Sequence, residues 1–415
     1  MTYDNLVVDF GPPGQSAVDK SNQTLFHFTT GTYINHQYNV EDLRCADEVR
    51  KSDPNNDQDG NSKEKEYDLT DLLGLYPSRI DEHGLTTHER FFAWTLRKTL
   101  CTHGPPSFRS FKKHLGHPDV IDQVPIRKTE HCPVKAMRLD NSTVSGNIDA
   151  MEGIKVQGGL KKKDASQPDL PTHLSEYVQL VCGDLGTAER IDAAKRRRAM
   201  DIFESNQMFD LIFIPGMFHV KMALVDLLWR LFIQPFQGKF DPTSALASTK
   251  FLCPRTKDTN KLTKGTPTYQ QMKRFLRHLG IGEQLCCWKT ALIDRFGSSA
   301  WTDKASSSGI TWEDIIDMSY MLVKTLFKLK LVKARRNDAS DKSRDKQLEN
   351  TMLRNTYLLL YEETVHAMNF GDVGRLERCL IDWIPAFRAV GKHKYAFHLM
   401  KFYIKVNFVY PEGLK

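Results

Sequence analysis

The alternation of apolar and polar residues is most informative between Tyr177 and Met222. An apolar run, Tyr177–Cys182, is followed by a basic, helix-favouring segment from about Thr187 to Asn206. A second apolar run, Phe209–Pro215, comes next, and another helical pattern begins after it. Two short apolar runs that flank one helix predict a βαβ unit with a buried parallel pair of strands.

Two polar residues lie at the end of these predicted strands. Asp184 follows the first run at a Gly-Asp turn, and His219 comes just after the second run. Ligands and catalytic groups of open α/β sheets collect at this edge, so both residues are candidates for a site. Each also has a structural alternative: the aspartate as a turn former or helix cap, the histidine as a core residue bonded to a carbonyl.

The chain before this unit is rich in β-formers, and the chain after it is helical. Leu6–Phe10 and Thr24–Phe28 are predicted strands, with the second extended towards Ile34. Ser52–Lys65 is a polar loop, and Asn141–Asp169 has few bulky apolar residues and is expected to be an exposed linker. Four parts result: a β-rich part of the core (1–50), a loop-rich and partly helical insertion or linker (51–170), the βαβ core unit (171–233) and an α-helical region (234–415).

Helix signals are frequent in the last part. Tyr269–Leu279 has one apolar face and is expected to end at Gly280. Thr311 is expected to cap a helix over Trp312–Arg336, and Arg344–Phe370 is expected to end at the next glycine. Pro385 should kink or break the helix that follows.

Composition narrows the class of protein. The 415 residues are 40% hydrophobic and 26% charged, as in a soluble globular protein, and the net charge of +7 permits a phosphate-backbone partner without requiring one. The N-terminus lacks the features of a signal peptide, and the eight scattered cysteines include no CxxC pair, which favours an intracellular, reducing compartment. Polar residues interrupt the longest apolar region, so no membrane span is expected. No motif for a small-molecule cofactor is evident, and the oligomeric state is left open.

Acidic residues on two predicted strands suggest a metal site. Asp4 leads into the first strand, and Asp184 ends a later one. Ribonuclease-H-like nucleases build a Mg²⁺ site from such a pair, usually with a third acid from a later helix. Hard oxygen ligands hold Mg²⁺ while leaving coordination positions for phosphate and water. Two such ions can stabilise the attacking and leaving oxygens of a phosphoryl transfer.

Two further groups of residues have alternative interpretations. A basic run within a predicted helix is either a solvated face, a phosphate contact or a nuclear import signal; it consists of Lys195, Arg196, Arg197 and Arg198. A histidine- and cysteine-rich region is either a zinc site or a set of unrelated loop residues; it contains Cys101, His103, His114, His117, His131 and Cys132.

Several short segments, spread over nearly the whole chain, resemble the fungal, mainly basidiomycete family known as domain of unknown function 6589. They occur in the family's order and are Tyr3–Leu6, Asp42–Cys45, Val181–Leu185 with Thr187 and Arg190, Gly216–Met222, Gly371–Arg375 and Lys394–Ala396. The family looks transposon-derived, so the resemblance implies a mobile-element origin.

The chain is also similar to cut-and-paste transposases of the Activator and hobo type, in which an Asp ends one strand and a Cys/Asp-x-x-His motif follows the next. The similarity implies an α/β fold with a ribonuclease-H-like mixed sheet core and a large α-helical C-terminal region. It implies Mg²⁺-dependent cleavage and joining of DNA strands in the nucleus. The implied metal ligands are Asp4 and Asp184. His219 would lie near the scissile phosphate, and Lys221 and the basic run would contact the DNA backbone. Glu363 would be the third acid, with Glu362 and Asp372 as alternatives.

Three departures favour a second interpretation. Gly216 stands where the motif has Cys or Asp, and His398 follows Lys-Tyr-Ala where relatives often carry Glu. Asp4 lies so near the N-terminus that a preceding DNA-binding module is not expected, as in a truncated or decayed copy. The alternative function is therefore that of a catalytically inactive remnant that binds nucleic acid or another partner.

Overall fold

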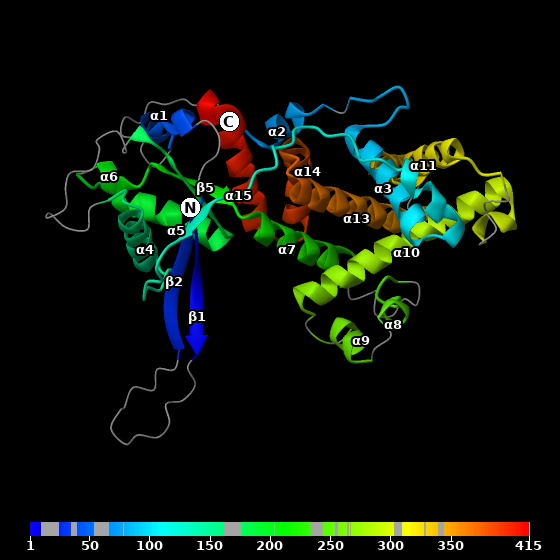
Figure 1. The fold of residues 1–415 in the computed structure, drawn as a ribbon, viewed down its shortest axis with the longest axis horizontal. Helices are drawn as coiled ribbons and strands as arrows, with labels where there is room; N and C mark the ends of the chain where they lie inside the picture. Colours follow the sequence, from blue (N-terminus) through cyan, green and yellow to red (C-terminus); the bar gives the residue numbers. More distant parts are fainter. Residues whose placement is uncertain are drawn as a thin grey trace, which may run out of the picture. The chain divides into compact units, whose positions relative to one another are not determined.

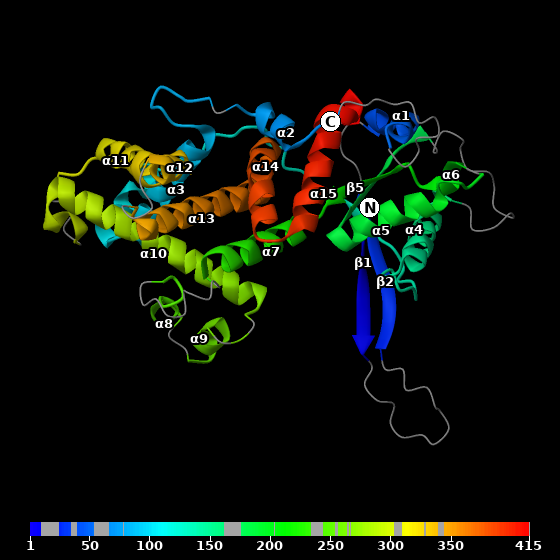
Figure 2. The same ribbon diagram turned by 180° about the vertical axis from the view of Figure 1, so that it is seen from behind.

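In the computed structural model, the chain forms two compact units (Figures 1 and 2). Unit 1 comprises Met1–Leu73, Ile126–Val220 and His393–Lys415, and unit 2 comprises Gly74–Pro125 and Lys221–Lys392. The polar loop predicted over Ser52–Lys65 falls largely outside the described residues. The residues described are 1–9, 25–34, 40–53, 66–77, 79–161, 176–202, 204–233, 244–253, 256–263, 265, 267–302, 309–327, 329–338 and 344–414.

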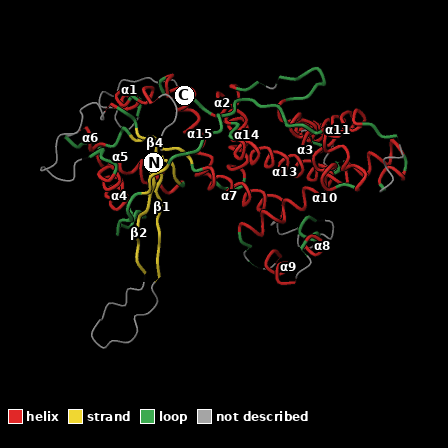
Figure 3. The backbone as a smooth tube through the Cα atoms, in the orientation of Figure 1, coloured by secondary structure: helices red, strands yellow, loops and turns green. Residues whose placement is uncertain are grey.

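The core of unit 1 is a five-stranded mixed sheet, drawn in yellow in Figure 3. Its strand order is β3-β2-β1-β4-β5, in which β2 runs antiparallel to both neighbours and β1, β4 and β5 run parallel to one another. The predicted parallel pair is confirmed as β4 and β5. The strands are β1 (Thr2–Asp9), β2 (Leu25–Ile34), β3 (His131–Pro133), β4 (Gln179–Gly183) and β5 (Leu211–Pro215).

The first strand joins the parallel part of the sheet through very few residues. Thr2 pairs with Cys182. The amino group of Met1 donates to the Leu180 carbonyl at 2.6 Å, and the Cys182 amide donates to the Met1 carbonyl at 2.9 Å. The start of the chain therefore lies directly beside β4, the strand that precedes Asp184.

One face of the sheet is covered by α4 (Val144–Gln157) and α5 (Leu185–Arg198) (Figure 1). The core between them contains Tyr3, Val181 and Ile191 from the sheet side and α5. It also contains three apolar residues of α4, namely Ile148, Met151 and Ile154.

The expectation of an exposed linker over Asn141–Asp169 was therefore wrong for α4. Its large apolar residues recur every third position on one face, but Gly146, Ala150 and Gly153 lie among them and dilute the apolar signal.

The other face of the sheet is covered by α1 (Ala46–Lys51) and the C-terminal π-helix Lys405–Val409. Before this π-helix, α15 (His393–Ile404) packs against α5 and β5. The last helix thus belongs to the sheet-containing unit, whereas the predicted boundaries grouped it with the helical region from residue 234 onwards.

Unit 2 is helical throughout the residues described, and α7 (Met217–Leu228) carries the chain into it. Its centre is formed by α3, α10 and α13, which pack against one another, with α11 against α3 and α14 against α13. The main helices are α3 (Thr87–His103), α10 (Tyr269–Phe296), α11 (Trp312–Leu326), α12 (Leu329–Asp338), α13 (Lys346–Phe370) and α14 (Val373–Ala389). Its shorter helices are α8 (Thr249–Leu252) and α9 (Thr256–Thr263), whereas α6 (Glu204–Gln207) belongs to unit 1 and α2 (Leu69–Leu75) spans the boundary between the units.

The predicted helix ends had mixed outcomes. The capping box at Thr311 is confirmed, and Gly371 ends α13 with a left-handed φ of 67°. Gly280 does not end a helix, because α10 continues through it and tertiary contacts support the longer helix. Pro385 lies within α14 and does not end it. In the described part of the chain, no helix combines the length and apolar character that a bilayer crossing requires.

Buried ion pairs fasten the helices of unit 1. The Lys195 ammonium on α5 donates to Asp53 at 3.0 Å, and both side chains are almost completely buried. Lys401 on α15 contacts Asp192 of α5 at 2.8 Å. These contacts link α5 to α15 and to the segment after α1.

We expect the Lys195–Asp53 pair to be important for stability. Lys195→Met should lower the free energy of unfolding by about 1.5–3 kcal/mol, because it removes the nearest cationic partner of the buried Asp53 carboxylate and leaves Lys405 at 4.0 Å. Arg196→Met is the matched control on the same helix, and its exposed side chain predicts a change within about 0.5 kcal/mol. Urea unfolding of both variants measures the difference, and equal midpoints would contradict this role.

Candidate functional site

The ends of β4 and β5 come together at one edge of the sheet. Gly183 pairs with Pro215, and the Gly216 amide donates to the Gly183 carbonyl at 2.7 Å. A β-carbon at Gly216 would lie 2.7 Å from that same carbonyl oxygen, closer than real contacts allow. The glycine that departs from the transposase motif is therefore required by this close backbone approach.

His219 and Asp184 both lie at this edge. His219 is on the first turn of α7, three residues after Gly216, and its side chain is partly exposed. Its ring Cδ2 is 3.4 Å from the position that a β-carbon on Gly216 would take. Asp184 directly follows the last residue of β4.

Asp184 is held by the start of α5. Its Oδ1 atom accepts hydrogen bonds from the amide of Thr187 at 2.7 Å and from the hydroxyl of Thr187 at 3.0 Å. The structural alternative considered for Asp184 is thus correct, since it is the N-cap of α5. The same bonds fix the direction of the carboxylate, and no contact to its Oδ2 atom is found among the described residues. A cap and a ligand are compatible roles for this side chain.

Asp4 on β1 and Asp184, just after β4, each follow the one paired position of these strands by two residues. Because β1 and β4 are parallel and Thr2 pairs with Cys182, the positions two residues further along are Asp4 and Asp184. Successive residues of a strand point to opposite faces. Tyr3 points into the core, and Asp4 is exposed. Neighbouring strands lie about 4.8 Å apart, a spacing at which carboxylates from both can reach one cation.

The pKa of Tyr3, the neighbour of Asp4, depends on the groups around this edge of the sheet. Burial raises its pKa to about 12, opposed by its hydrogen bond with Asn147 and by the nearby Arg190. The Asn147 amide donates to the Tyr3 hydroxyl at 2.9 Å. This buried bond anchors β1 to α4 immediately next to Asp4.

Arg190 is a residue of this edge that the sequence-based site did not include. Its Nε atom donates to the Ser142 carbonyl at 2.9 Å. A β-carbon on Gly186 would lie 2.8 Å from Arg190 Nη1 and 3.3 Å from Asp184 Oδ1. Both side chains therefore lie close to Gly186. Arg190 is among the residues that carry the family resemblance, but a spacing of six residues does not place two side chains on one helix face, so the local pattern gives no signal for its position beside Asp184.

The predicted DNA-contacting run divides into two kinds of residue. Lys195 is only 5% exposed and bonds Asp53, so the structure contradicts its assignment to the DNA backbone. Arg198 contacts Asp201 at 3.0 Å and Glu152 at 3.2 Å. Arg196 and Arg197 are exposed and remain suited to phosphate, and Lys221, partly exposed, lies on α7 two residues after His219.

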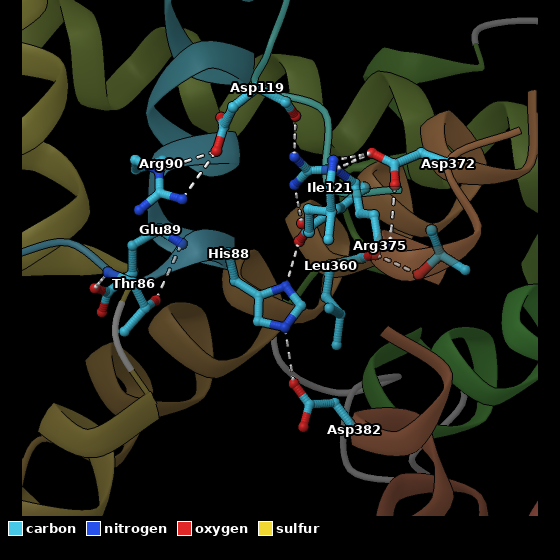
Figure 4. Close-up of polar contacts among 12 residues, drawn as sticks. Thr86, His88, Glu89, Arg90, Asp119, Ile121, Leu360, Asp372, Arg375 and Asp382 are labelled. Atoms are coloured by element: carbon cyan, nitrogen blue, oxygen red, sulfur yellow. Dashed lines mark hydrogen bonds and ion pairs between the residues drawn. The ribbon is translucent and has the colours of Figure 1, made fainter. Parts of the chain in front are cut away.

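Glu363, the predicted third acid, lies in unit 2, where it is completely buried. Its Oε1 atom accepts from Arg375 at 2.7 Å, and its Oε2 atom is 2.6 Å from Nδ1 of His88. The other ring nitrogen of His88 is 3.3 Å from Asp382, as Figure 4 illustrates. Both carboxylate oxygens of Glu363 are thus already engaged by cationic groups of its own unit.

The alternative acid Asp372 has a structural role in the same network. It caps α14, and its carboxylate accepts hydrogen bonds from the backbone amides of Ile121 and Asp122 at 3.2 and 3.1 Å. Burial alone would raise the pKa of Asp372, but these amide bonds and the Arg375 guanidinium lower it. Arg375, wholly buried, contacts Glu363, Asp372 and the Asp119 carbonyl (Figure 4). The Gly371–Arg375 segment therefore forms a helix junction.

One group among the described residues has metal-ligand atoms that lie within 4.8 Å of one another: His88, Glu363 and Cys379. Two of these atoms, His88 Nδ1 and Glu363 Oε2, are 2.6 Å apart and are hydrogen-bonded to each other, so this group forms an ion-pair network. The zinc alternative for the region between Cys101 and Cys132 gains no support, because its last two members lie on β3 of unit 1 and the others lie in unit 2.

The protein thus combines two units. One is a mixed α/β unit with acidic residues at an edge of its sheet, and the other is a helical unit whose segments interrupt the first in sequence. The model of a family of unknown function, DUF6589, matches residues 67–415, and the chain belongs to this family. The matched range includes Asp184 and His219, whereas Asp4 precedes it. No curated protein and no solved structure matches the chain.

The close approach at Gly216 makes a first prediction for this edge. Gly216→Ala should lower the free energy of unfolding by about 1–3 kcal/mol, because the added methyl group meets the Gly183 carbonyl. Gly282→Ala is the control, since nothing lies within 4 Å of its added carbon and it is inside α10. That control should be more stable than the wild type by up to about 1 kcal/mol. Urea midpoints that shift in the same direction would refute the argument.

The His88 network makes a second prediction. Burial lowers the pKa of His88, but Glu363 and the neighbouring hydrogen bonds outweigh this and leave it well above the ordinary value. The stabilisation from protonated His88 is therefore fully present below about pH 6.5 and is lost as pH rises through the raised pKa. The difference in unfolding free energy between wild type and His88→Gln should shrink as the pH rises above about 6.5. A difference that is constant with pH would contradict the prediction.

Proposed function

We propose that this protein is a transposon-derived, divalent-metal-dependent enzyme that cleaves and joins DNA strands, built on a ribonuclease-H-like core. The observation that supports the proposal is the parallel pairing of Thr2 with Cys182, because continuing this pairing by two residues would bring Asp4 beside Asp184. Nuclear location follows from a DNA substrate and stays a prediction.

The topology of unit 1 supports the ribonuclease-H-like assignment. The strand order β3-β2-β1-β4-β5, with only β2 antiparallel, is the arrangement of such cores. Helices α4 and α5 connect the strands as expected for the type, and unit 2 consists of two stretches, one between β2 and β3 and the other between β5 and α15.

The donor set at the edge fits Mg²⁺. Mg²⁺ is commonly held by one or two carboxylates together with the phosphates of the substrate, so Asp4 and Asp184 suffice for one ion. When bound, the cation would neutralise the charge on the scissile phosphate. Thr187 keeps the Asp184 carboxylate oriented, and Arg190 adds positive charge beside it.

His219 is proposed to bind the phosphate or the leaving oxygen. It lies on the first turn of α7, where free backbone amides and the positive end of the helix favour an anion. Arg196, Arg197 and Lys221 are the proposed backbone contacts. The third acid is not assigned, because Glu363 and Asp372 are both engaged within unit 2.

A second candidate function is a nucleic-acid-binding protein without catalysis. It is favoured because, among the described residues, Asp4 and Asp184 belong to no group of three or more His, Cys, Asp or Glu side chains that could hold a metal ion. His398 of α15, which stands where relatives often carry Glu, lines a small cavity of about 40 Å³ with Asp192 and Lys401. That cavity has room for little more than water.

Nicking of end-labelled duplex DNA and supercoiled plasmid with Mg²⁺ or Mn²⁺ tests the first function. Asp4→Asn and Asp184→Asn should each reduce nicking by about a hundredfold or more, because each removes a charge that stabilises the reacting phosphate. Asparagine is as good an N-cap as aspartate, so Asp184→Asn should leave α5 folded. Thermal unfolding of the variants checks this.

Asp149→Asn is the matched control, since Asp149 is exposed on α4 and lies outside this edge. Nicking that survives both catalytic substitutions would refute the roles of Asp4 and Asp184. DNA binding by the wild type without metal-dependent nicking, weakened by Arg196→Gln and Arg197→Gln, would instead establish the second function.

A further inference from the structure

Unit 2 contains a cavity of about 450 Å³ between α3, α10 and α13. These three helices form the centre of the unit and pack against one another. Pockets for small molecules and cofactors typically have about 300–1,000 Å³, so the size fits a ligand of that kind.

The charge of the lining is strongly uneven. Lys98, Lys273 and Arg277 line the cavity, and Glu362 is the one carboxylate among the described lining residues. In the part of the chain that the structure describes, none of the three cations forms an ion pair. The Lys98 and Lys273 ammonium groups instead lie 4.9 and 5.9 Å from the rings of Trp94 and Tyr269. Glu362 interacts electrostatically with Lys98 and Arg277, but it is one carboxylate against three cations, so the lining keeps an excess of positive charge.

The two lining histidines respond to this positive charge. Burial, together with the charges of Arg375 and Lys98, lowers the pKa of His366 to about 4. Burial also lowers the pKa of His103, helped by Arg277 and Lys98. Both rings are consequently neutral near pH 7 and can exchange hydrogen bonds with a ligand.

Aromatic and aliphatic side chains form the rest of the lining. The rings of His366 and Phe370 stack with centroids 4.3 Å apart at an angle of 28°. Phe370 is 50% exposed, unusual for a large apolar residue, and so offers an open ring face. The aliphatic part is formed by Leu276, Ile281, Leu358 and Val365.

We propose that this cavity binds a free nucleoside di- or triphosphate. Its phosphates contact Lys98, Lys273 and Arg277, and its base stacks against Phe370 and the aliphatic wall. Several phosphates match the several cations, whereas an uncharged ligand would leave them unpaired. The aromatic surface matches a planar base, since stacking on an aromatic side chain stabilises any base. The site is independent of the acidic edge in unit 1.

Isothermal titration calorimetry of the full chain tests the proposal with four probes: ATP, GTP, inorganic triphosphate and adenosine. At least one nucleotide should bind more tightly than both triphosphate and adenosine. Lys98→Gln and Arg277→Gln should each weaken nucleotide binding by about tenfold or more, as expected for loss of a charge-assisted hydrogen bond. Both side chains are exposed, so these substitutions should leave the fold intact.

Lys289→Gln is the matched control, because Lys289 is exposed on α10 and does not line the cavity. Phe370→Ala should weaken binding of the nucleotide but not of triphosphate. Absence of nucleotide binding, or wild-type affinity in both charge variants, would overturn the proposal. So would binding of an oligonucleotide that free nucleotides do not displace. Asp184→Asn should retain nucleotide binding, which separates this site from the proposed nuclease.

Discussion

The parallel pairing of β1 with β4 is the constraint on which the candidate site depends. It rests on one residue pair and on two backbone hydrogen bonds of Met1, which join positions about 180 apart in sequence. Without it, Asp184 would be an ordinary helix cap and Asp4 an exposed acid on a β-ribbon. With it, Asp4 and Asp184 each follow a paired residue by two positions, near the edge where Gly183 and Gly216 bring the backbones of β4 and β5 together.

Buried charge has a different role in each unit. In unit 1, Lys195 and Asp53 neutralise each other inside the packed helices, so part of a basic run serves stability. In unit 2, Arg375 forms ion pairs with Glu363 and Asp372 and donates a hydrogen bond to a backbone carbonyl. Its Cζ atom also lies 5.1 Å from the centroid of the Phe91 ring. Such groups tolerate burial only when each finds a partner, which explains why these acids are unsuited to bind an additional cation.

Several local signals in the sequence were reliable, although Gly280 and Pro385 did not end their helices, and the long-range pairings could not be predicted. The β4–β5 pair, the Thr311 capping box and the glycine after α13 follow from neighbouring residues, and all three were predicted. The burial of Lys195 depends on a partner 142 positions away, and the role of Glu363 on His88, 275 positions away. Neither pairing can be recognised from the local sequence pattern. Asp184 lies at the expected edge, while the Arg190 beside it and the need for Gly216 became apparent only in three dimensions.

The division into units also has a consequence for how the chain folds. Unit 1 is assembled from three separate stretches, and α15 packs on α5 only after the whole segment Lys221–Lys392 has been synthesised. Bringing the ends of so long a segment together costs conformational entropy, and early folding of unit 2 would reduce that cost. Folding of the helical unit therefore helps α15 to reach the sheet. Until α15 packs there, the sheet lacks its last helix and exposes apolar surface that is prone to aggregation.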